Sequence, residues 1–301
     1  MPSATLVTGG KIAERIDAET RALLREAARR GSPAARVVAV AAMADRSVTA
    51  YLESLERKSS GLGIAFETRI ETGATTARLI EAIAGLGADP SVTGILLELP
   101  LPDGVDARAV QAAIDPRKDV EGVTPASLGW LALGKPRLAP ATAVAVLEVL
   151  AETGMTLRGA DAVVVGASEI VGKPVGLLLL DRLATVTVCH VATQDLASKT
   201  SRADVIVSAT GQARLVGREH VKPGAVVVDV GYSRIPDGTA PDGKAKFRVV
   251  GDVRQEEVAG IASFLTPVPG GVGPVTVSAL FRNVAGAAAG TGWRPRLPAD
   301  P

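Results

Sequence analysis

The segment from Thr266 to Thr276 has the composition of a ligand-binding loop. It reads TPVPGGVGPVT, so three prolines and three glycines fall within eleven residues. Proline fixes φ near about −65° and glycine permits positive φ, which together give a stiff loop whose bare backbone a flat ligand can approach. We expect the segment to form neither strand nor helix. A structural turn is the alternative, but a turn usually needs only one or two such residues.

The segment ADAVVVGASEIVGKP, residues 160–174, has the order of strand, glycine turn and helix start that a phosphate-binding turn requires. It is not a GxGxxG sequence, because only Gly166 and Gly172 are present, while Ser168 offers a hydroxyl donor. A plain turn between strand and helix fits the local pattern equally well. Its position in the first strand–helix unit of an α/β domain favours a dinucleotide, whose pyrophosphate would meet the helix start.

The next strand ends without the residue that selects a coenzyme. An acidic residue at this point binds the ribose diol of NAD, and a basic residue accommodates the extra phosphate of NADP. The chain instead continues His190, Val191, Ala192, so the choice between NAD and NADP stays open. His190 fits a structural role as well as a ribose or phosphate contact. Lys173 fits either a phosphate contact or an exposed helix charge.

Composition argues against several other kinds of site. The formal charge is +1 with acids and bases interspersed, which gives no footprint for nucleic acid or an anionic membrane. His190 and His220 are the only histidines and neither has a second ligand at metal spacing, so no metal site is predicted. Cys189 is the only cysteine, which excludes an internal disulfide and suits a reducing compartment.

The sequence also gives no sign of export or membrane insertion. No apolar run approaches the ~18 residues of a membrane span. The first thirty residues mix charges into an apolar pattern and do not resemble a signal peptide. We therefore expect a cytoplasmic enzyme that acts on a small molecule.

Hydrophobic periodicity places these segments on alternating helices and strands. Apolar residues at helical spacing run from Ile12 to Ala27, from Val48 to Leu55 and from Leu79 to Ile83, with short apolar strand-like runs between them. A second series follows a helix near Ala141–Glu152. Its predicted strands are Ala162–Gly166, Thr185–Cys189, Asp204–Ser208 and Ala225–Asp229. This alternation predicts an α/β fold with mostly parallel sheets covered on both faces.

The length and the order of elements predict two α/β domains around a cleft. A chain of 301 residues with 47% hydrophobic residues can build two cores. The last apolar helix, Val275–Ala288, follows the second sheet and is expected to return to the first domain. We therefore expect a first domain of residues 1–140 plus 275–301, and a second, Rossmann-like dinucleotide-binding domain of residues 141–274.

Six segments, in this order along the chain, resemble one enzyme family. They are GILLELPLP from Gly94, RKDVEG from Arg117, VVVGASEIVGKP from Val163, VVDVGYSR from Val227, GDV from Gly251 and the proline-glycine loop. Together they resemble the bifunctional methylenetetrahydrofolate dehydrogenase/methenyltetrahydrofolate cyclohydrolase family over nearly the whole chain. The resemblance implies oxidation of a folate methylene bridge with NAD or NADP, then hydration of the methenyl product, usually by a homodimer. It also implies that folate lies against the first domain and the proline-glycine loop.

At the family's catalytic positions the chain keeps one residue and departs at three. The Tyr that lies against the folate ring falls on Tyr51. The Lys that the cyclohydrolase step requires falls on Leu55, one helical turn later on the same face. The Gln that bonds this Lys falls on Glu98, and the Asp that holds the pterin's donor edge falls on Glu121. Lys58, one further turn along, could reach toward the site or remain a surface charge.

These departures predict a change in chemistry. Leucine can neither donate nor accept a proton, and general acid–base help contributes about 10²–10⁴-fold, so we expect cyclohydrolase turnover to be weak or missing. Hydride transfer depends more on alignment and can persist. A carboxyl in an apolar cleft without a cationic partner tends to have a raised pKa, so Glu98 could act as an acid or base. Without the resemblance, Tyr51 is an ordinary packing residue, and Glu98 and Glu121 are solvated carboxylates.

The resemblance implies further contacts to both ligands. Those to folate are Leu99, Pro100, Pro269, Gly270, Gly271, Val272 and Gly273. Those to the coenzyme are Thr142, Gly166, Ala167, Ser168, Ile170, Val171, Gly172, His190 and Gly231.

Three functional interpretations follow from the sequence. The leading one is a dehydrogenase that converts methylene- to methenyltetrahydrofolate with NAD or NADP and has reduced or lost cyclohydrolase activity. The second is a specialised paralogue that uses the folate's methylene carbon on another substrate, favoured by three altered polar positions. The third is a catalytically silent folate- or nucleotide-binding protein that works through dimerisation.

Overall fold

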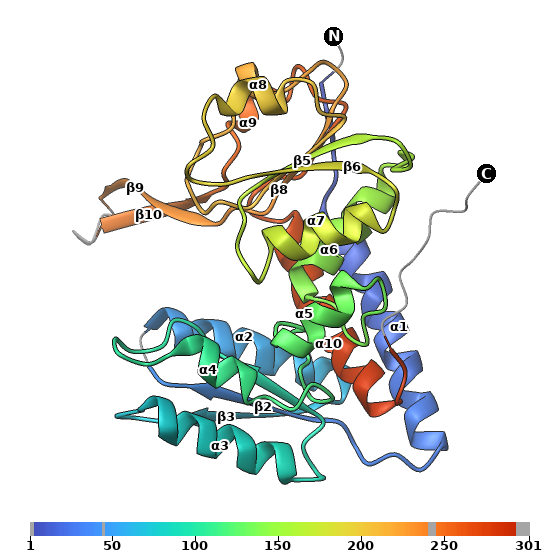
Figure 1. Cartoon of the computed structure of the whole chain (residues 1–301), viewed down its shortest axis with the longest axis vertical. Coiled ribbons are helices and arrows are strands. Elements are labelled where there is room, and N and C mark those ends of the chain that lie inside the picture. Colours follow the sequence, from blue (N-terminus) through green and yellow to red (C-terminus); the bar gives the residue numbers. More distant parts are fainter. Residues whose placement is uncertain (1–2, 44–45, 240–244, 293–301) are drawn as a thin grey trace. The chain divides into compact units, whose positions relative to one another are not determined.

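The computed structural model describes residues 3–43, 46–239 and 245–292 (Figure 1). Within them the chain divides into two compact units. The larger-sheet unit comprises residues up to Ala13 and Thr142–Thr276, and the smaller-sheet unit comprises Glu14–Ala141 and the segment from Val277 onward. Each unit is an α/β layer structure, which confirms the predicted fold class.

The smaller-sheet unit is built on three parallel strands in the order β3-β2-β4. These are β2 (Arg36–Ala41), β3 (Ala65–Ile70) and β4 (Gly94–Leu97). Its helices are α2 (Arg46–Leu62), α3 (Thr76–Ala88), α4 (Ala107–Ala112) and α5 (Pro125–Ala132), with parts of α1 (Gly9–Arg29) and α10 (Val272–Ala288). A strand covered on both faces reads as a continuous apolar run, and the sequence RVVAVA of β2 fits this central position.

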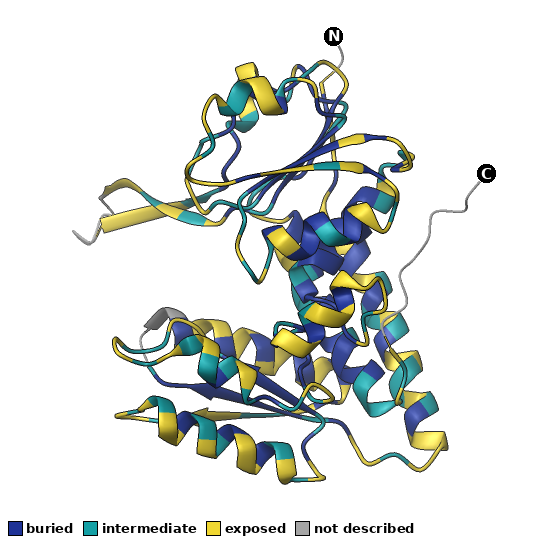
Figure 2. Ribbon diagram, viewed as in Figure 1, coloured by how far each residue is buried: buried dark blue, intermediate teal, exposed yellow. Residues whose placement is uncertain are grey.

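Helix α3 shows how apolar spacing becomes packing in this unit. Leu79, Ile83 and Leu86 are its buried residues, at intervals of three and four. They pack against Val38 and Val40 of β2 in one hydrophobic cluster. The opposite face of α3 is exposed, as the burial colouring in Figure 2 shows. The cluster fixes the carboxyl ends of β2 and β4, beyond which Glu98 lies.

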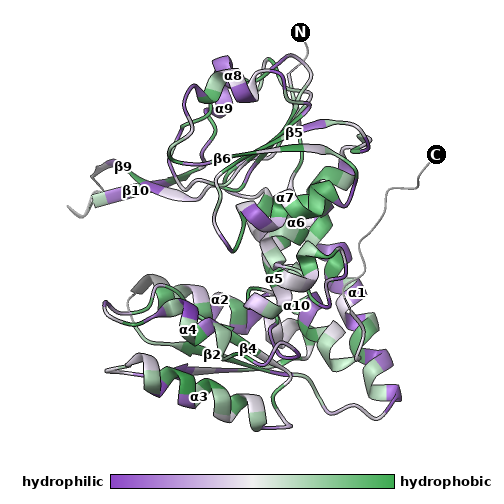
Figure 3. Cartoon of the chain, in the orientation of Figure 1, coloured by the Kyte–Doolittle hydropathy of each residue, from purple (hydrophilic) through white to green (hydrophobic). Residues whose placement is uncertain are grey.

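The larger-sheet unit contains a six-stranded sheet in the order β1-β11-β8-β7-β5-β6, with every neighbouring pair parallel. The strands are β1 (Thr5–Leu6), β5 (Asp161–Val165), β6 (Thr185–Cys189), β7 (Val205–Ser208), β8 (Val226–Asp229) and β11 (Phe264–Leu265). Helices α6 (Ala141–Glu152), α7 (Gly172–Leu180), α8 (Leu196–Thr200) and α9 (Gln255–Val258) accompany them. The hydrophobic colouring of α6 and α7 in Figure 3 matches their burial.

Three further elements complete the described residues of this unit. A single 3₁₀ turn covers Arg218–His220. Strands β9 (Ser233–Thr239) and β10 (Ala245–Val250) form an antiparallel pair outside the main sheet. The guanidinium of Arg234 lies 5.2 Å from the ring centroid of Phe247 on this hairpin.

The N-terminal segment lies in a different unit from the one expected. Residues 1–140 were assigned to the first domain, but β1 pairs with β11 and extends the six-stranded sheet. The amide of Val7 donates to the carbonyl of Leu265 at 2.9 Å, which continues this pairing. A two-residue strand is too short to show periodicity, so its partner is decided only by the tertiary fold. Residues 293–301, included in the expected first domain, lie outside the described residues.

The expectation that Thr266–Thr276 contains no helix was wrong for its second half. The segment leaves β11 as a loop, but α10 begins at Val272 and includes Gly273 and Pro274. Proline is tolerated in the first turn of a helix, because the N–H that it lacks would have no partner within the helix. The stiff loop is therefore confined to residues 266–271.

Candidate active site

Tyr51, Glu98 and Glu121 are coupled electrostatically within the smaller-sheet unit. Tyr51 lies on α2, Glu98 directly follows β4, and Glu121 lies in the loop before α5. The amide of Glu98 donates to the carbonyl of Val40 at 2.9 Å, which continues the ladder between β4 and β2. The pKa of Tyr51 is raised, first by loss of hydration and then by the charges of Glu121 and Glu98. The sequence-predicted residues of this unit thus share one electrostatic environment.

The Glu121 carboxyl of this cluster has a raised pKa. Loss of hydration is the largest cause, the charges of Asp119 and Glu98 add to it, and together they raise the pKa of Glu121 to about 8. A backbone hydrogen bond at Leu97 acts in the opposite direction. The Glu121 side chain is therefore mostly a neutral carboxylic acid at pH 7, able to donate as well as accept a hydrogen bond.

Asp119 holds the loop that carries Glu121. This carboxylate is fully buried. It accepts hydrogen bonds from the amides of Gly122 at 2.9 Å and Thr124 at 2.8 Å, and from the hydroxyl of Ser127 at 2.6 Å. The amide of Val123 is a further donor at 3.2 Å. Asp119 precedes Glu121 and all four donors follow it, so these hydrogen bonds close the chain around Glu121 and fix its backbone.

Gly122 allows this reversal because no side chain fits there. Its φ is 70°, in the left-handed region. A Cβ at this position would lie 2.7 Å from the carbonyl carbon of Ala139. The glycine that follows Glu121 is thus required by both conformation and space.

Asn283, on α10, was missed by the sequence reasoning. Its side-chain amide donates to the carbonyls of Val120 and Ala139, each at 2.9 Å. The available signal was an amide side chain in a mainly apolar helix, and a buried amide usually has a specific partner. Asp119, the second missed residue, stood in the KDVEG segment that had been singled out only for Glu121.

Leu55 is a core residue of the smaller-sheet unit. It is 0% exposed and ranks among the largest fully buried side chains, whereas Tyr51 one turn earlier is 41% exposed. The two residues share a helical face in the sequence pattern, but that face passes from the surface into the core along α2. No proton-transfer group is present at position 55.

Lys58 does not serve as a replacement cation. Its ammonium lies 2.5 Å from the carboxylate of Asp17 on α1, and both side chains are largely buried. The ion pair directs Lys58 toward α1, so the suggestion that it reaches toward the candidate site was wrong. It is also not the solvated surface charge that was the alternative.

The predicted folate-contact segments each contain a cis peptide bond before proline. These are Leu99–Pro100, immediately after Glu98, and Val268–Pro269 in the proline-glycine loop. Gly270 has φ of 99°, and its carbonyl accepts a hydrogen bond of 2.8 Å from the amide of Gly9. The start of α1 therefore fixes the loop in the larger-sheet unit, while Leu99 and Pro100 lie in the other unit.

A pocket of about 530 Å³ lies at the carboxyl ends of β5, β6 and β7. Of the predicted coenzyme contacts, Gly166, Ala167, Ser168 and His190 line it, with Val191, Thr193, Ala209, Thr210 and Gln212 among its other residues. In open α/β sheets this is the edge at which dinucleotides bind, next to the first strand of the domain. The helix that follows the glycine turn, α7, begins at Gly172.

The glycines of this turn are required by close backbone packing. Gly166 has φ of 114°, and a Cβ there would lie 2.2 Å from the carbonyl oxygen of Ala209. A Cβ on Gly172 would lie 1.9 Å from the carbonyl oxygen of Gly166. The Ser168 hydroxyl oxygen accepts from the amides of Val171 and Gly172, at 3.2 and 3.3 Å. A compact, bare turn at a helix start fits the pyrophosphate of a dinucleotide.

The other predicted coenzyme contacts do not line the described pocket. Ile170 is exposed at the tip of the turn, Val171 precedes α7, and Thr142 lies in the first turn of α6. Gly231 is buried, and its amide donates to the carboxylate of Asp229 at 2.9 Å. These residues keep their predicted roles only as proposals.

Gly231 borders a buried acidic pair. Loss of hydration is the main cause that raises the pKa of Asp229 to about 6, with the charge of Asp252 adding to it against several backbone hydrogen bonds. Asp252 accepts from the hydroxyl of Ser208 at 3.0 Å and the amide of Thr210 at 2.7 Å. The pair thereby ties the ends of β7 and β8 to the segment after β10.

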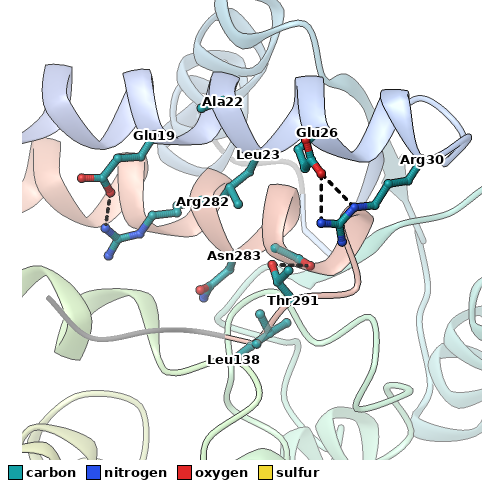
Figure 4. Close-up of a pocket in the computed structure, with 11 residues that line it drawn as sticks. Glu19, Ala22, Leu23, Glu26, Arg30, Leu138, Arg282, Asn283 and Thr291 are labelled. Atoms are coloured by element: carbon teal, nitrogen blue, oxygen red, sulfur yellow. Dashed lines mark hydrogen bonds and ion pairs between the residues drawn. The ribbon is translucent and has the colours of Figure 1, made fainter.

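A second pocket, of about 580 Å³, lies in the smaller-sheet unit away from these residues (Figure 4). Helices α1 and α10 contribute Glu19, Leu23, Glu26 and Arg282 to its lining. Glu19 and Arg282 form an ion pair of 2.8 Å across it. Neither Tyr51 nor the carboxylates of the candidate site line it, so the pocket is separate from the predicted chemistry.

Sequence comparison matches both units to one family. The profile of the tetrahydrofolate dehydrogenase/cyclohydrolase catalytic domain matches residues 7–121, and that of the family's NAD(P)-binding domain matches residues 140–291. The chain belongs to the tetrahydrofolate dehydrogenase/cyclohydrolase family. This confirms the resemblance identified from the sequence segments.

Individual members of the tetrahydrofolate dehydrogenase/cyclohydrolase family are similar over nearly their whole lengths. The bifunctional protein FolD 1 of Rubrobacter xylanophilus is 46% identical over 288 residues, covering 95% of this chain and 97% of the relative. The bifunctional protein FolD of Rhodobacter capsulatus is 43% identical over 279 residues, covering 92% and 91%. These relatives carry the bifunctional name.

Solved structures of the family share the fold. The Trypanosoma brucei methylenetetrahydrofolate dehydrogenase-cyclohydrolase, complexed with NADP and an inhibitor, matches with a TM-score of 0.88 and 33% identity, covering 96% of this chain and 98% of that one. The Campylobacter jejuni bifunctional enzyme matches with a TM-score of 0.86 and 35% identity, covering 95% and 99%. The range matched to the family's NAD(P)-binding domain, residues 140–291, covers the larger-sheet unit apart from the residues up to Ala13, and extends along α10 into the smaller-sheet unit.

None of the described helices combines the length and the apolar character needed to span a membrane. Within the same residues, no group of three or more His, Cys, Asp or Glu side chains is arranged to hold a metal ion.

Proposed function

We propose that this chain oxidises methylenetetrahydrofolate to methenyltetrahydrofolate with a nicotinamide coenzyme and has little or no cyclohydrolase activity. The observation that carries the proposal is the fully buried Leu55 at the position of the family's catalytic lysine. The coupled cluster of Tyr51, Glu98 and Glu121 supports retention of a polar site beside it.

The oxidation requires ligand binding and electrostatic stabilisation of charge rather than proton transfer. The coenzyme supplies a hydride acceptor when bound. Loss of hydride from the methylene carbon leaves a positive charge shared by the two folate nitrogens. Glu98 would stabilise this charge, Tyr51 would pack against the pterin ring, and Glu121 would bond the pterin's donor edge. Leu99 and Pro100, which directly follow Glu98, would add apolar contacts to the folate.

The hydration step requires a group that can accept a proton, and position 55 has none. Water must lose a proton as it attacks the methenyl carbon, and a positioned base contributes about 10²–10⁴-fold to such a step. Leu55 offers no such group, and Lys58 is bound to Asp17. The methenyl product would therefore be released rather than hydrated on the enzyme.

A direct assay tests this proposal. Purified protein is mixed with methylenetetrahydrofolate and each coenzyme, and the absorbance of the methenyl product and of the reduced nicotinamide is followed together. Equal, persistent rises in both signals are expected. Decay of the methenyl signal faster than in an enzyme-free control would contradict the loss of cyclohydrolase activity. Binding without turnover would favour a silent binding protein, and turnover only with an added amine would favour the specialised paralogue.

We also propose that the chain works as a cytoplasmic homodimer, as the family resemblance implies. Light scattering on the eluting peak of a size-exclusion column should give twice the mass of 30.7 kDa. A monomeric mass at micromolar concentration would contradict the dimer.

A further inference from the structure

The coenzyme pocket carries little positive charge. Its described lining residues include neither lysine nor arginine, and neither aspartate nor glutamate. The only ionisable side chain among them is that of His190. A 2′-phosphate brings roughly two negative charges into the pocket and needs cationic partners to replace its water, whereas a ribose hydroxyl needs only a hydrogen bond.

The residues that follow β6 are those that distinguish NAD from NADP in domains of this kind. The residue just beyond the second strand of such a domain contacts the 2′ position of the adenosine ribose. Here His190 and Val191 follow Cys189, and both line the pocket. The Val191 side chain is fully exposed, so its place could hold a long cationic side chain, yet valine offers no polar atom.

The His190 ring is oriented by a hydrogen bond from the backbone. Its Nδ1 accepts a hydrogen bond of 3.2 Å from the amide of Ala192, so this nitrogen carries no proton. Nε2 is the ring nitrogen left to donate, and the His190 backbone amide donates to the hydroxyl of Thr193 at 2.8 Å. The ring can therefore donate one hydrogen bond, from Nε2, to a ribose hydroxyl.

The cationic side chains near the pocket residues in sequence either pair with an acidic residue or do not line the pocket. Lys173 pairs with Glu169 at 3.8 Å, and Arg214 pairs with Glu256. Lys199 lies on α8, where its charge opposes the burial that raises the pKa of the Cys189 thiol. Lys199 does not line the described pocket. It is nevertheless the cation to exclude as a ligand of a 2′-phosphate, and the experiment below includes it.

We propose that the coenzyme is NAD rather than NADP, and that Val191 is the residue that decides this choice. The inference deepens the proposed function, because it concerns the same nucleotide site. It stands on the identity of the lining residues, on the exposed valine at the end of β6 and on the hydrogen bond that occupies Nδ1 of His190 and leaves Nε2 to face a hydroxyl.

Coenzyme binding without folate tests the inference separately from turnover. Dissociation constants of NADH and NADPH for the full chain are measured by nicotinamide fluorescence and by calorimetry. NADH is expected to bind about tenfold or more tightly than NADPH, which corresponds to ~1.4 kcal/mol. Equal or tighter binding of NADPH, or binding of neither coenzyme, would overturn the inference.

Three variants assign the effect to one position. In Val191→Arg the ratio of the NADPH to the NADH dissociation constant should fall about tenfold, and the gain should shrink at high salt because it is electrostatic. Val191→Gln, similar in length but uncharged, should leave the ratio within about twofold. Lys199→Ala should also leave it unchanged, and a rise in the ratio would identify Lys199 as a phosphate ligand and sink the proposal.

The two proposals fail in different ways. Tight NADH binding with no oxidation of methylenetetrahydrofolate would end the proposed function and leave the coenzyme inference standing. Oxidation of methylenetetrahydrofolate with a preference for NADP would do the reverse.

Discussion

Asn283 donates a hydrogen bond of 2.9 Å from its side-chain amide to the carbonyl of Val120, the residue immediately before Glu121. The same amide bonds the carbonyl of Ala139 at 2.9 Å. Asn283, Val120 and Ala139 are all buried, so both carbonyls depend on this side chain for their donor. Helix α10 thus holds the backbone of the loop that carries the acidic residue of the candidate folate site.

Replacing Asn283 with alanine should weaken both stability and folate binding. Two buried carbonyls lose their donor, and an unsatisfied buried group costs about 1–3 kcal/mol, so a loss of roughly 2–4 kcal/mol is expected in urea unfolding. The KM for folate should rise several-fold while the KM for the coenzyme changes little. Equal changes in both constants would show a general loss of structure instead.

Ser278→Ala is the matched control on the same helix. The Ser278 hydroxyl is buried and has no hydrogen-bond partner among the described residues. Removing an unsatisfied hydroxyl should leave the unfolding free energy within about 0.5 kcal/mol or raise it. A loss comparable to that of Asn283→Ala would mean that α10 tolerates no change at all.

The Glu121 carboxyl should make stability depend on pH. Its pKa is about 8 in the folded chain against an ordinary value of 4.5. The folded state therefore holds a proton that the unfolded state releases, and stability from this group is lost as pH rises from the ordinary pKa through about 8. Glu121→Gln removes the effect. As pH rises across this window, the free energy of unfolding of the variant should therefore increase relative to that of the wild type, by on the order of 2 kcal/mol after allowance for solvent access.

The same group should shape the pH dependence of folate binding. Ionised Glu121 accepts two hydrogen bonds from the pterin edge, so folate affinity should rise between pH 7 and 9 as the carboxyl loses its proton, whose pKa is about 8. The Glu121→Gln variant should show a flat profile in titrations with a folate analogue. A wild-type profile without an inflection in this range would remove Glu121 from the folate site.

Substitutions at position 55 should distinguish its contribution to packing from its effect on methenyl hydrolysis. Leu55→Lys places an ammonium where the side chain is 0% exposed, so unfolding measurements should show a loss of about 2–5 kcal/mol. At a temperature where the variant is folded, the methenyl product should decay faster than with the wild type. Leu55→Met keeps the volume and should cost less than about 1.5 kcal/mol, with no gain in methenyl hydrolysis. Similar hydrolysis by both variants would exclude the lysine as the missing group.

The glycine turn should be intolerant of a single added carbon. In Gly172→Ala the new Cβ would lie 1.9 Å from the Gly166 carbonyl oxygen, so the turn must open at a cost of about 1–3 kcal/mol. Coenzyme binding, measured by nicotinamide fluorescence, should weaken by about tenfold or more. Gly85→Ala, on α3 where no atom lies within 4 Å of the added carbon, should instead stabilise the chain by about 0.5–1 kcal/mol. Unchanged coenzyme binding in Gly172→Ala would show that the turn does not contact the nucleotide.

The sequence by itself determined the fold class, the family and the glycine turn. Parallel α/β units leave a local signature, because buried strands are short apolar runs and the helices between them repeat every three to four residues. The close approach at Gly166 and Gly172 permits only glycine, so the residues at these positions already disclose the turn. The absence of lysine at position 55 is likewise readable without coordinates.

Only the tertiary structure decided how the candidate site is held and charged. The pKa of Glu121 is raised because dehydration and the charges of Asp119 and Glu98 act on it after folding. Lys58 was excluded as a substitute cation by its ion pair with Asp17, 41 positions away in the chain. Asn283 reaches Val120 across 163 positions. Such effects depend on neighbours that local sequence patterns do not specify, because they arise from distances between residues that only folding brings together.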